Sequence, residues 1–540
     1  MALLRRKLLL VGLAGLLLPA APADANTYTV KAGGGGDFTS IQDCADKAEA
    51  GDTCVVFAGA YNETVSPKSD GAPGKPITYA VNPGDCVTVK GFSFGSASYV
   101  TVGEPNSPRC SKNGFAFSGF EISGGQVTWR KLTNVIFQNN YVHNTSGVCM
   151  KGPGSNFFFG ASTYVYVLNN IFTVCGSIGE GLAGGMQIEG NHWLIDGNTL
   201  SHLEDGIYLY GAYMVLRNNT FGPLLPSDYT TQHPDGVEST CTRGRDYPLQ
   251  RMLYEGNTTI DWGAANAHGF LLRDTQGCGQ TSNVIRFSQF LNLGSDWIAN
   301  DGNSTGELIY NNSVQNTQAA AKDKDYSDLV FTHGDTGANI INNVIADTGR
   351  PYAGDYCIFA DGTSTAGFVE HHNLCFSSTW GGAWQAPFGG YDYAKSDILN
   401  KDPRFVNPKS DLHLQGRSPA IGAGGPLTVA TSAGTNSTSL AVVNAGFFSD
   451  GYGLNGVQAD WIRIGPSVTV QVTSINYSSN IITLTSPVSW ASGAPIYLYR
   501  NSEGAVVLGG ANPDIGAFPS GSPAAPAEPL PPSDLHAVAK

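Results

Sequence analysis

A short phrase that starts with Asn, Gly or a related residue recurs through the middle of the chain. It reads NNYV at Asn139, NNIF at Asn169 and NNTF at Asn218. Related forms are GNTL, GNTT, SQFL, NNSV, NNVI and HNLC, and successive phrases lie between 21 and 38 residues apart. Asn tolerates left-handed backbone and hydrogen-bonds its own turn, so it suits the corner of a stacked coil. The pattern predicts an all-β chain folded as a parallel β-helix, because propeller blades of about 40 residues do not fit the shorter steps.

The two ends of the predicted solenoid carry different signals. After Ser40, apolar Ile41, Ala45 and Ala48 predict a short amphipathic N-terminal helix that caps the first coil. Near the C-terminus, the stretch 459–489 alternates apolar and polar side chains and predicts that residues 426–508 form a small inserted β-barrel or sandwich. The expected order is a signal peptide (1–25), the β-helix (26–425), the insertion, a return segment that closes the β-helix (509–519) and a Pro/Ala-rich linker or disordered tail (520–540).

The N-terminus has the features of a secretory signal. Arg5, Arg6 and Lys7 precede an apolar run at 8–18, and a small-x-small cleavage site follows at 23–25. The run is too short to span a bilayer, so we expect a secreted protein, extracellular or periplasmic, without a membrane anchor. The formal net charge of −14 argues against nucleic acid as a partner, since phosphate binding needs clustered Lys and Arg. We expect a monomer that binds polysaccharide.

Ten cysteines, an even number, predict disulfides in an exported chain. Pairing of neighbours closes only local loops, which suits an elongated fold. The predicted pairs are 44–54, 86–110, 149–175, 241–278 and 357–375. No CxxC or HExxH spacing occurs, so the sequence does not suggest a zinc site.

Both ends of the predicted β-helix resemble a known family. AGDTCVVFAGAYNETV and the following GAPGKPITYAVNPGDCVTVKG resemble the first coils of secreted right-handed parallel β-helix proteins of the pectate-lyase superfamily. The closing pair DPRFVNPKSDLHLQGRSPAIGAG and PDIGAF resembles the same family. The resemblance implies a right-handed parallel β-helix. It concerns the scaffold and does not by itself specify a reaction.

Eight segments can be overlaid by an inward apolar residue at their third position. Strand side chains alternate between faces, so the fourth and sixth residues then point outward, on rungs about 4.8 Å apart. The segments are SGVCMK (146–151), GGMQIE (184–189), DGIYLY (205–210), DGVEST (235–240), HGFLLR (268–273), DWIAND (296–301), DLVFTH (328–333) and DYCIFA (355–360). Their outward residues predict a polar strip long enough for several sugar units. The strip contains Lys151, Glu189, Tyr208, Tyr210, Glu238, Arg273, Asp301 and His333.

An Asp-Gly pair opens two of these segments, at Asp205 and Asp235. One interpretation is turn chemistry, in which Asp accepts backbone N–H bonds and Gly takes a positive φ. The other is calcium, because two carboxylates one rung apart repel each other and a shared hard cation offsets the repulsion. Both interpretations stay open, and calcium is the one cofactor that the sequence suggests.

The strip suits β-elimination from a uronic-acid polysaccharide. In that reaction a cation or Arg neutralises the carboxylate, a base removes the acidified C5 proton and an acid assists the leaving oxygen. We expect Arg273 to act as neutraliser or acid and Tyr210 as an acid/base partner. The candidate bases are His333, His268 and Lys151.

One segment of the strip carries its own resemblance. GFLLRD at 269–274 resembles the strand that bears a catalytic Arg in alginate lyases and chondroitinase B. The lysine motif expected one coil earlier is not recognisable, and Arg243 and Arg245 stand there instead. The expected substrate-binding residues are Lys151, Glu189, Tyr208, Arg243, Arg245 and Asp301.

Two other function classes fit the same strip. Glu238 and Asp301 lie two rungs apart, about 9.6 Å, which suits the carboxyl pair of an inverting glycoside hydrolase. An aromatic-rich groove without a matched acid and base would instead fit a non-catalytic glycan-binding surface protein. We expect a polysaccharide lyase, with these two classes as alternatives.

Overall fold

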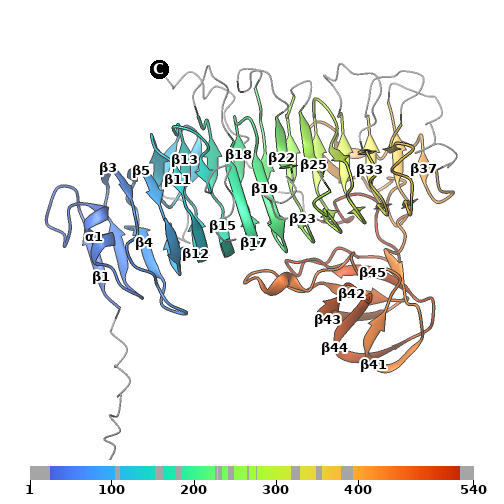
Figure 1. Cartoon of the computed structure of the whole chain (residues 1–540). Helices are drawn as coiled ribbons and strands as arrows, with labels where there is room; N and C mark the ends of the chain where they lie inside the picture. The colour runs from blue at the N-terminus through green and yellow to red at the C-terminus, as the bar shows by residue number, and fades with distance from the viewer. Residues whose placement is uncertain are drawn as a thin grey trace, which may run out of the picture.

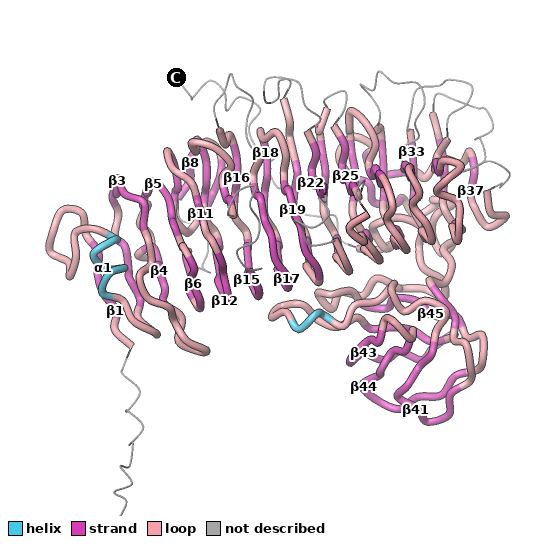
Figure 2. The backbone as a smooth tube through the Cα atoms, in the orientation of Figure 1, coloured by secondary structure: helices cyan, strands magenta, loops and turns pink. Residues whose placement is uncertain are grey.

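Parallel strands stack rung upon rung along most of the chain (Figure 1). The structure, a computed structural model, describes residues 25–103, 110–152, 162–176, 184–225, 228, 234–240, 249–263, 267–274, 277–317, 329–347, 356–378 and 393–522. Within these ranges, 35 strands form one continuous sheet. Among the described residues, helix is confined to α1 (Ile41–Lys47) and the 3₁₀ turn η1 (Gly451–Gly453), which are cyan in Figure 2. The predicted all-β parallel β-helix is confirmed.

Each coil contributes strands to three faces, of which the first carries the predicted polar strip. We call this the strip face. Its strands are β3 (Gly59–Val65), β5 (Val87–Ser93), β11 (Val127–Thr128), β14 (Met150–Lys151), the first half of β17 (Met186–Asp196), β19 (Ile207–Ala212), β22 (Asp235–Thr240), β25 (His268–Arg273), β28 (Ile298–Asp301), β31 (Leu329–Thr332) and β34 (Phe359–Ala360).

The second face, which we call the docking face, meets the C-terminal insertion. Its strands are β1 (Thr27–Val30), β2 (Thr53–Val56), β4 (Ile77–Val81), β6 (Ser96–Ser98), β7 (Val100–Val102), β12 (Lys131–Gln138), β15 (Ser162–Leu168), the second half of β17, β20 (Val215–Arg217), β23 (Leu253–Glu255), β26 (Val284–Arg286), β29 (Leu308–Tyr310), β32 (Asn339–Ile341) and β35 (Val369–His371).

The third face completes each coil. Its strands are β10 (Glu121–Ser123), β13 (Tyr141–His143), β16 (Ile171–Thr173), β18 (Thr199–Ser201), β21 (Thr220–Phe221), β24 (Thr258–Ile260), β27 (Gln289–Leu291), β30 (Ser313–Gln315), β33 (Val344–Ala346), β36 (Leu374–Phe376) and β37 (Ile398–Leu399). Two antiparallel hairpins stand apart from the three faces: β8 (Cys110–Lys112) with β9 (Phe115–Phe117), and β38 (Phe405–Asn407) with β39 (Asp411–Leu414).

Buried asparagines explain the recurring phrase. The first residue of the phrase takes left-handed backbone, with φ of 57° at Asn139 and 53° at Asn169. The second residue is fully buried, as at Asn140 and Asn170. Asn170 Oδ1 accepts a hydrogen bond from the Asn140 backbone N–H at 2.9 Å, and its Nδ2 donates to the Phe137 carbonyl oxygen at 2.9 Å. Each rung thus satisfies the polar groups of its neighbour at this corner.

The N-terminal cap is helix α1 (Ile41–Lys47), as predicted. Ser40 Oγ accepts from the Asp43 backbone N–H at 3.0 Å, which caps the helix. Four predicted disulfides are present: 44–54, 86–110, 149–175 and 357–375. Cys278 is also disulfide-bonded, and its predicted partner Cys241 lies outside the described residues.

The insertion is β-rich, as predicted, and forms a separate six-stranded antiparallel sheet with the strand order β40-β45-β42-β43-β44-β41. Its elements are β40 (Thr428–Val429), β41 (Gly434–Ala441), the 3₁₀ turn η1 (Gly451–Gly453), β42 (Trp461–Ile464), β43 (Val468–Asn476), β44 (Ile481–Trp490) and β45 (Pro495–Arg500). After β45 the chain returns to the solenoid. There the Gly424 N–H donates to the Pro513 carbonyl oxygen at 2.9 Å, and the Ala517 N–H donates to Ser313 Oγ at 2.9 Å.

A buried ion network joins the insertion to the docking face. Arg286 on β26 contacts Glu255 on β23 at 2.5 Å and both carboxylate oxygens of Asp460 at 2.8 Å. Tyr310 on β29 donates to the Phe447 carbonyl oxygen at 2.8 Å. An apolar cluster continues the contact, with Leu194, Val215 and Leu253 from the solenoid and Ile462 and Leu498 from the insertion among its members. The insertion therefore packs against the solenoid through both buried polar and apolar contacts.

The predicted signal peptide and most of the predicted tail lie outside the described residues, which start at 25 and end at 522. In the ranges that the structure describes, no helix has the length and apolarity needed to cross a bilayer.

Candidate functional site

The strip face brings the central predicted residues onto one surface. Tyr208 pairs with Glu238, and Arg273 pairs with Asp301. Between them in the same strands, the alternate residues belong to the apolar core: Ile207 and Leu209 of β19, Val237 of β22, Phe270 and Leu272 of β25, and Ile298 of β28. Tyr208, Tyr210, Glu238, Arg273 and Asp301 therefore lie on the outer side of the sheet.

The predicted register is wrong at the two ends of the strip. Lys151 pairs with Gln187 instead of Glu189, because only two residues of that coil form strand β14. Asp301 pairs with Thr332, and His333 follows in a turn with φ of 60°. Loops of different length precede these strands, so an overlay by the third residue cannot fix their register.

The Asp-Gly turns also differ from prediction. Asp205 Oδ1 accepts from the Asp235 backbone N–H at 3.0 Å, and Asp235 Oδ1 accepts from the His268 backbone N–H at 3.1 Å, so the expected turn bonds are present. Gly206 and Gly236, however, do not take the positive φ that the turn interpretation predicts. A Cβ at Gly206 would lie 2.3 Å from the Gly236 carbonyl oxygen, and close approach between rungs is therefore what requires glycine there.

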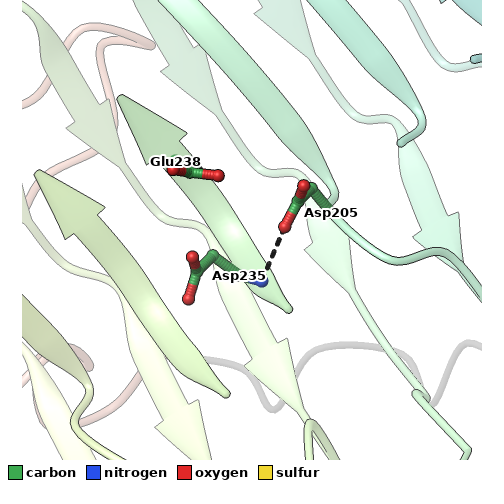
Figure 3. A group of neighbouring side chains, drawn as sticks. All are labelled: Asp205, Asp235 and Glu238. Atoms are coloured by element: carbon green, nitrogen blue, oxygen red, sulfur yellow. Dashed lines mark hydrogen bonds between the residues drawn. The ribbon is translucent and has the colours of Figure 1, made fainter. Parts of the chain in front are cut away.

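Three carboxylates lie close together near the first residues of strands β19 and β22 (Figure 3). One oxygen each of Asp205, Asp235 and Glu238 lies within 4.8 Å of the others. Burial raises the pKa of Asp205 well above its usual range, and the charges of Asp235 and Glu238 raise it further. We call this group the carboxylate cluster. Its oxygen donors fit a hard divalent cation, which would relieve the mutual repulsion.

His268 adjoins the carboxylate cluster. Its Nδ1 lies 2.8 Å from Asp235 Oδ1, and its Nε2 lies 3.8 Å from Asp296 Oδ2. Burial alone would lower the pKa of His268, but the charge and hydrogen bond of Asp235, together with the charge of Asp296, raise it above its ordinary value. The two carboxylates therefore favour the protonated imidazole, which suits an acid better than a base.

A second polar group lies further along the strip. Arg273 Nε is 3.1 Å from Asp301 Oδ2, and His333 Nδ1 is 2.6 Å from Asp301 Oδ1. The side chain of His333 is 73% exposed, compared with 30% for Arg273 and 24% for Asp301. We call this group the Arg273 triad. It combines a cation, a carboxylate and an accessible imidazole.

The remaining predicted residues are less accessible. Glu189, Tyr210 and Glu238 are buried on the outer side of the sheet, and the rings of Tyr208 and Tyr210 contact edge to face with centroids 5.2 Å apart. Arg243 and Arg245 lie outside the described residues.

Two acidic neighbours were not singled out from the sequence. Asp296 faces His268, although its place at the head of DWIAND offered a signal. Asp335 stands behind the Arg273 triad and accepts from the Thr332 backbone N–H at 3.1 Å. Burial raises the pKa of Asp335 to about 6, with a smaller contribution from the charge of Asp301. Nothing in the sequence around Asp335 pointed to this position.

No protein-family model matches the chain. A curated relative, the uncharacterized protein YwoF of Bacillus subtilis (strain 168), is 32% identical over 98 residues, or 18% of this chain. The matched part spans about a fifth (20%) of that relative's length.

Several solved structures are similar to the chain. Pectate lyase Pel9A is 12% identical with a TM-score of 0.39, covering 74% of this chain and 91% of its own. The PL6 family alginate lyase AlyGC is 15% identical with a TM-score of 0.41, and the match covers 73% of this chain and 56% of AlyGC. XylC in complex with xylose is 11% identical with a TM-score of 0.42, covering 92% and 98%. The expected similarity to parallel β-helix polysaccharide lyases is present and weak, and it concerns the fold alone.

Proposed function

We propose that this protein is a secreted polysaccharide lyase that cleaves a uronic-acid-containing polysaccharide by β-elimination. The main support is the Arg273 triad, because a single carboxylate, Asp301, holds both a guanidinium and an exposed imidazole. β-Elimination needs these two functions on one sugar unit: a positive charge at the uronate carboxylate and a base at C5.

Arg273 is the proposed neutraliser. Its contact with Asp301 runs through Nε, which leaves the two Nη groups for a substrate carboxylate. A guanidinium fork binds a carboxylate through two parallel hydrogen bonds, which a lysine ammonium cannot reproduce.

His333 is the proposed base. In a neutral imidazole, donation from Nδ1 to Asp301 would leave the electron pair of Nε2 for proton abstraction. The exposure of the ring allows Nε2 to reach a bound sugar. Lys151 is a poor alternative, since it lies four rungs from β25, about 19 Å along the stack. His268 is a poorer candidate base, because its Nδ1 contacts Asp235 and its Nε2 faces Asp296.

The carboxylate cluster is the proposed calcium site. Asp205, Asp235 and Glu238 would hold the ion, which would neutralise the carboxylate of a neighbouring uronate. His268 would orient Asp235 through its Nδ1 contact and could donate its proton to a leaving oxygen. Tyr210 lies two rungs from Arg273, about 10 Å, and would face an adjoining sugar unit.

The test is a panel of alginate, pectate, glucuronan and glycosaminoglycans with added calcium. Elimination leaves an unsaturated uronate that absorbs ultraviolet light, so new absorbance with one substrate is the expected result. Arg273→Lys should abolish most of it, whereas Arg417→Lys, at an exposed arginine outside the strip, should not. Wild-type protein that gives no new absorbance on any uronate would overturn the proposal.

Glycoside hydrolysis is the second candidate. A protonated Asp205 beside Asp235 and Glu238 resembles the acid and base pair of a glycosidase, and its raised pKa favours this role when no cation is bound. The predicted inverting pair of Glu238 and Asp301 is less suitable, because Asp301 is engaged by Arg273 and His333. New reducing ends without ultraviolet absorbance would identify hydrolysis. Binding without cleavage would identify a glycan-binding protein.

A further inference from the structure

A pocket opens between the solenoid and the insertion, on the docking face. Its volume is about 340 Å³, within the range of about 300–1,000 Å³ that is common for small-molecule sites. It is lined by Ile136, Tyr166, Leu168, Asn169, Leu194, Asp196, Arg217, Asn455 and Gly456. None of these residues belongs to the strip, so the pocket is separate from the proposed catalytic groups.

We infer that this pocket binds a neutral glycosyl segment, and that the protein therefore has a second carbohydrate site distinct from the strip. Three features of the lining lead to this ligand class: an apolar floor, a polar rim and the absence of an available positive charge.

The floor comes from adjacent docking-face strands. Ile136, Tyr166 and Leu194 are register partners on β12, β15 and β17, and Leu168 follows on β15. Such a surface matches the C–H face of a pyranose ring, which packs on tyrosine and aliphatic side chains. Near the floor, Tyr164 of β15 begins a stack of rings with His192 and Tyr213 on successive coils, with centroids 5.0 and 5.5 Å apart.

The rim of the pocket supplies hydrogen-bonding groups from both the solenoid and the insertion. Asn169 and Asn455 are exposed at the pocket, from the solenoid and the insertion respectively. The Tyr166 hydroxyl accepts from the Asn455 backbone N–H at 3.2 Å, which leaves its own O–H to donate. A purely apolar ligand would displace water from these groups without replacing its hydrogen bonds, so hydroxyl-bearing ligands are favoured.

Charge separates this pocket from the strip. Arg217 uses Nε and Nη2 on Asp196, at 3.1 and 2.5 Å, Nη1 on Ser502, and Nη2 also on the Gly456 carbonyl oxygen. Glu503 lies 3.8 Å from the same guanidinium. Two carboxylates therefore surround one fully engaged cation, and a uronate would meet net negative charge. The pocket selects an uncharged sugar.

Titration calorimetry with cellohexaose, mannohexaose and xylohexaose tests the inference, with hexa-uronates as comparison. At least one neutral hexasaccharide should bind the wild-type protein. Leu168→Trp, which fills the pocket, should weaken that binding at least tenfold, and Asn455→Ala should weaken it about fivefold through loss of one hydrogen bond. Val369→Trp introduces an indole at an exposed site of β35, and Asn62→Ala repeats the Asn-to-Ala change at an exposed site of β3. Both variants should bind normally.

Two further measurements distinguish binding in this pocket from binding on the strip. Arg273→Ala should retain neutral-sugar binding, and Leu168→Trp should retain any uronate cleavage. The inference is overturned if no neutral hexasaccharide binds, or if Leu168→Trp binds as tightly as the wild-type protein. Loss of binding in Arg273→Ala but not in Leu168→Trp would place the neutral sugar on the strip instead.

Discussion

The strip face and the docking face carry arginines in opposite settings. Arg286 on the docking face is fully buried between Glu255 and Asp460, whereas Arg273 on the strip face is 30% exposed and contacts Asp301 through Nε. Both project from the outer side of the same continuous sheet. The difference shows that covering a face commits its charges to structure, while leaving a face open keeps them available for a ligand.

The largest effect is expected from breaking the buried network. Arg286→Met would leave Glu255 and Asp460 buried without a cation, which costs about 3–5 kcal/mol. Urea unfolding should show this loss, while Arg130→Met, at an exposed arginine, should change stability by less than about 0.5 kcal/mol. An equal, small change in both variants would mean that the network does not hold the insertion.

The next effect concerns turnover rather than stability. Arg273→Lys keeps the charge but loses the fork, so the rate on a uronate should fall about a hundredfold or more, with Tm nearly unchanged. Measurement of both kcat and Tm distinguishes a loss of catalysis from a loss of folded protein. Near-native turnover in Arg273→Lys would move the chemistry away from this triad.

Calcium should stabilise the folded protein by binding to the carboxylate cluster on the strip face. At a hundred times its Kd, calcium should raise the free energy of unfolding by about 2.7 kcal/mol. Because the pKa of Asp205 is raised, binding displaces a proton, and the effect should be larger at about pH 8 than at about pH 5. Asp235→Asn should remove the calcium effect in thermal melts, and Asp411→Asn, a carboxylate of β39, should retain it. A calcium shift that persists in Asp235→Asn would contradict this site.

The smallest effect is the titration of His268. Its pKa is raised in the folded state, so its stabilising contribution is complete below its ordinary value of about 6.5 and is lost as pH rises through the folded value. Tm of the calcium-free protein should fall over that window, and His268→Gln should flatten the fall. His413→Gln, at a histidine of β39 far from the strip in sequence, is the matched control. If the Tm of His268→Gln falls more steeply with pH than the Tm of the wild-type protein, the pKa of His268 is not raised by folding.

The sequence predicted the scaffold well because the scaffold is repetitive. The spacing of the phrases follows from the buried ladder of Asn140, Asn170 and Asn198, in which each amide oxygen accepts from the backbone N–H of the preceding coil. The third-position apolar residue likewise placed β19, β22, β25 and β28 in correct register.

What the sequence could not predict depends on contacts between distant segments. Arg286 lies 174 residues from Asp460, and its outward place on β26 looks like any solvated residue until the insertion covers it. Asp335 joins the Arg273 triad through a turn after β31, where no strand periodicity extends. The predicted register at Lys151 and His333 was wrong for a different reason. There the length of the preceding loop sets the register, and the apolar pattern does not.

Strand β17 has a consequence for how a long polymer would behave. It runs without a break from Glu189 on the strip face to Asp196 in the docking-face pocket, and it turns at Gly190, where φ is 151° and a Cβ would lie 2.1 Å from the Ser162 carbonyl oxygen. The two ends are thus held at most about 23 Å apart. A chain that carries both charged and uncharged stretches could occupy both at once, and the second contact would form at a high local concentration. Avidity for long mixed polymers would then exceed that for short fragments of either kind.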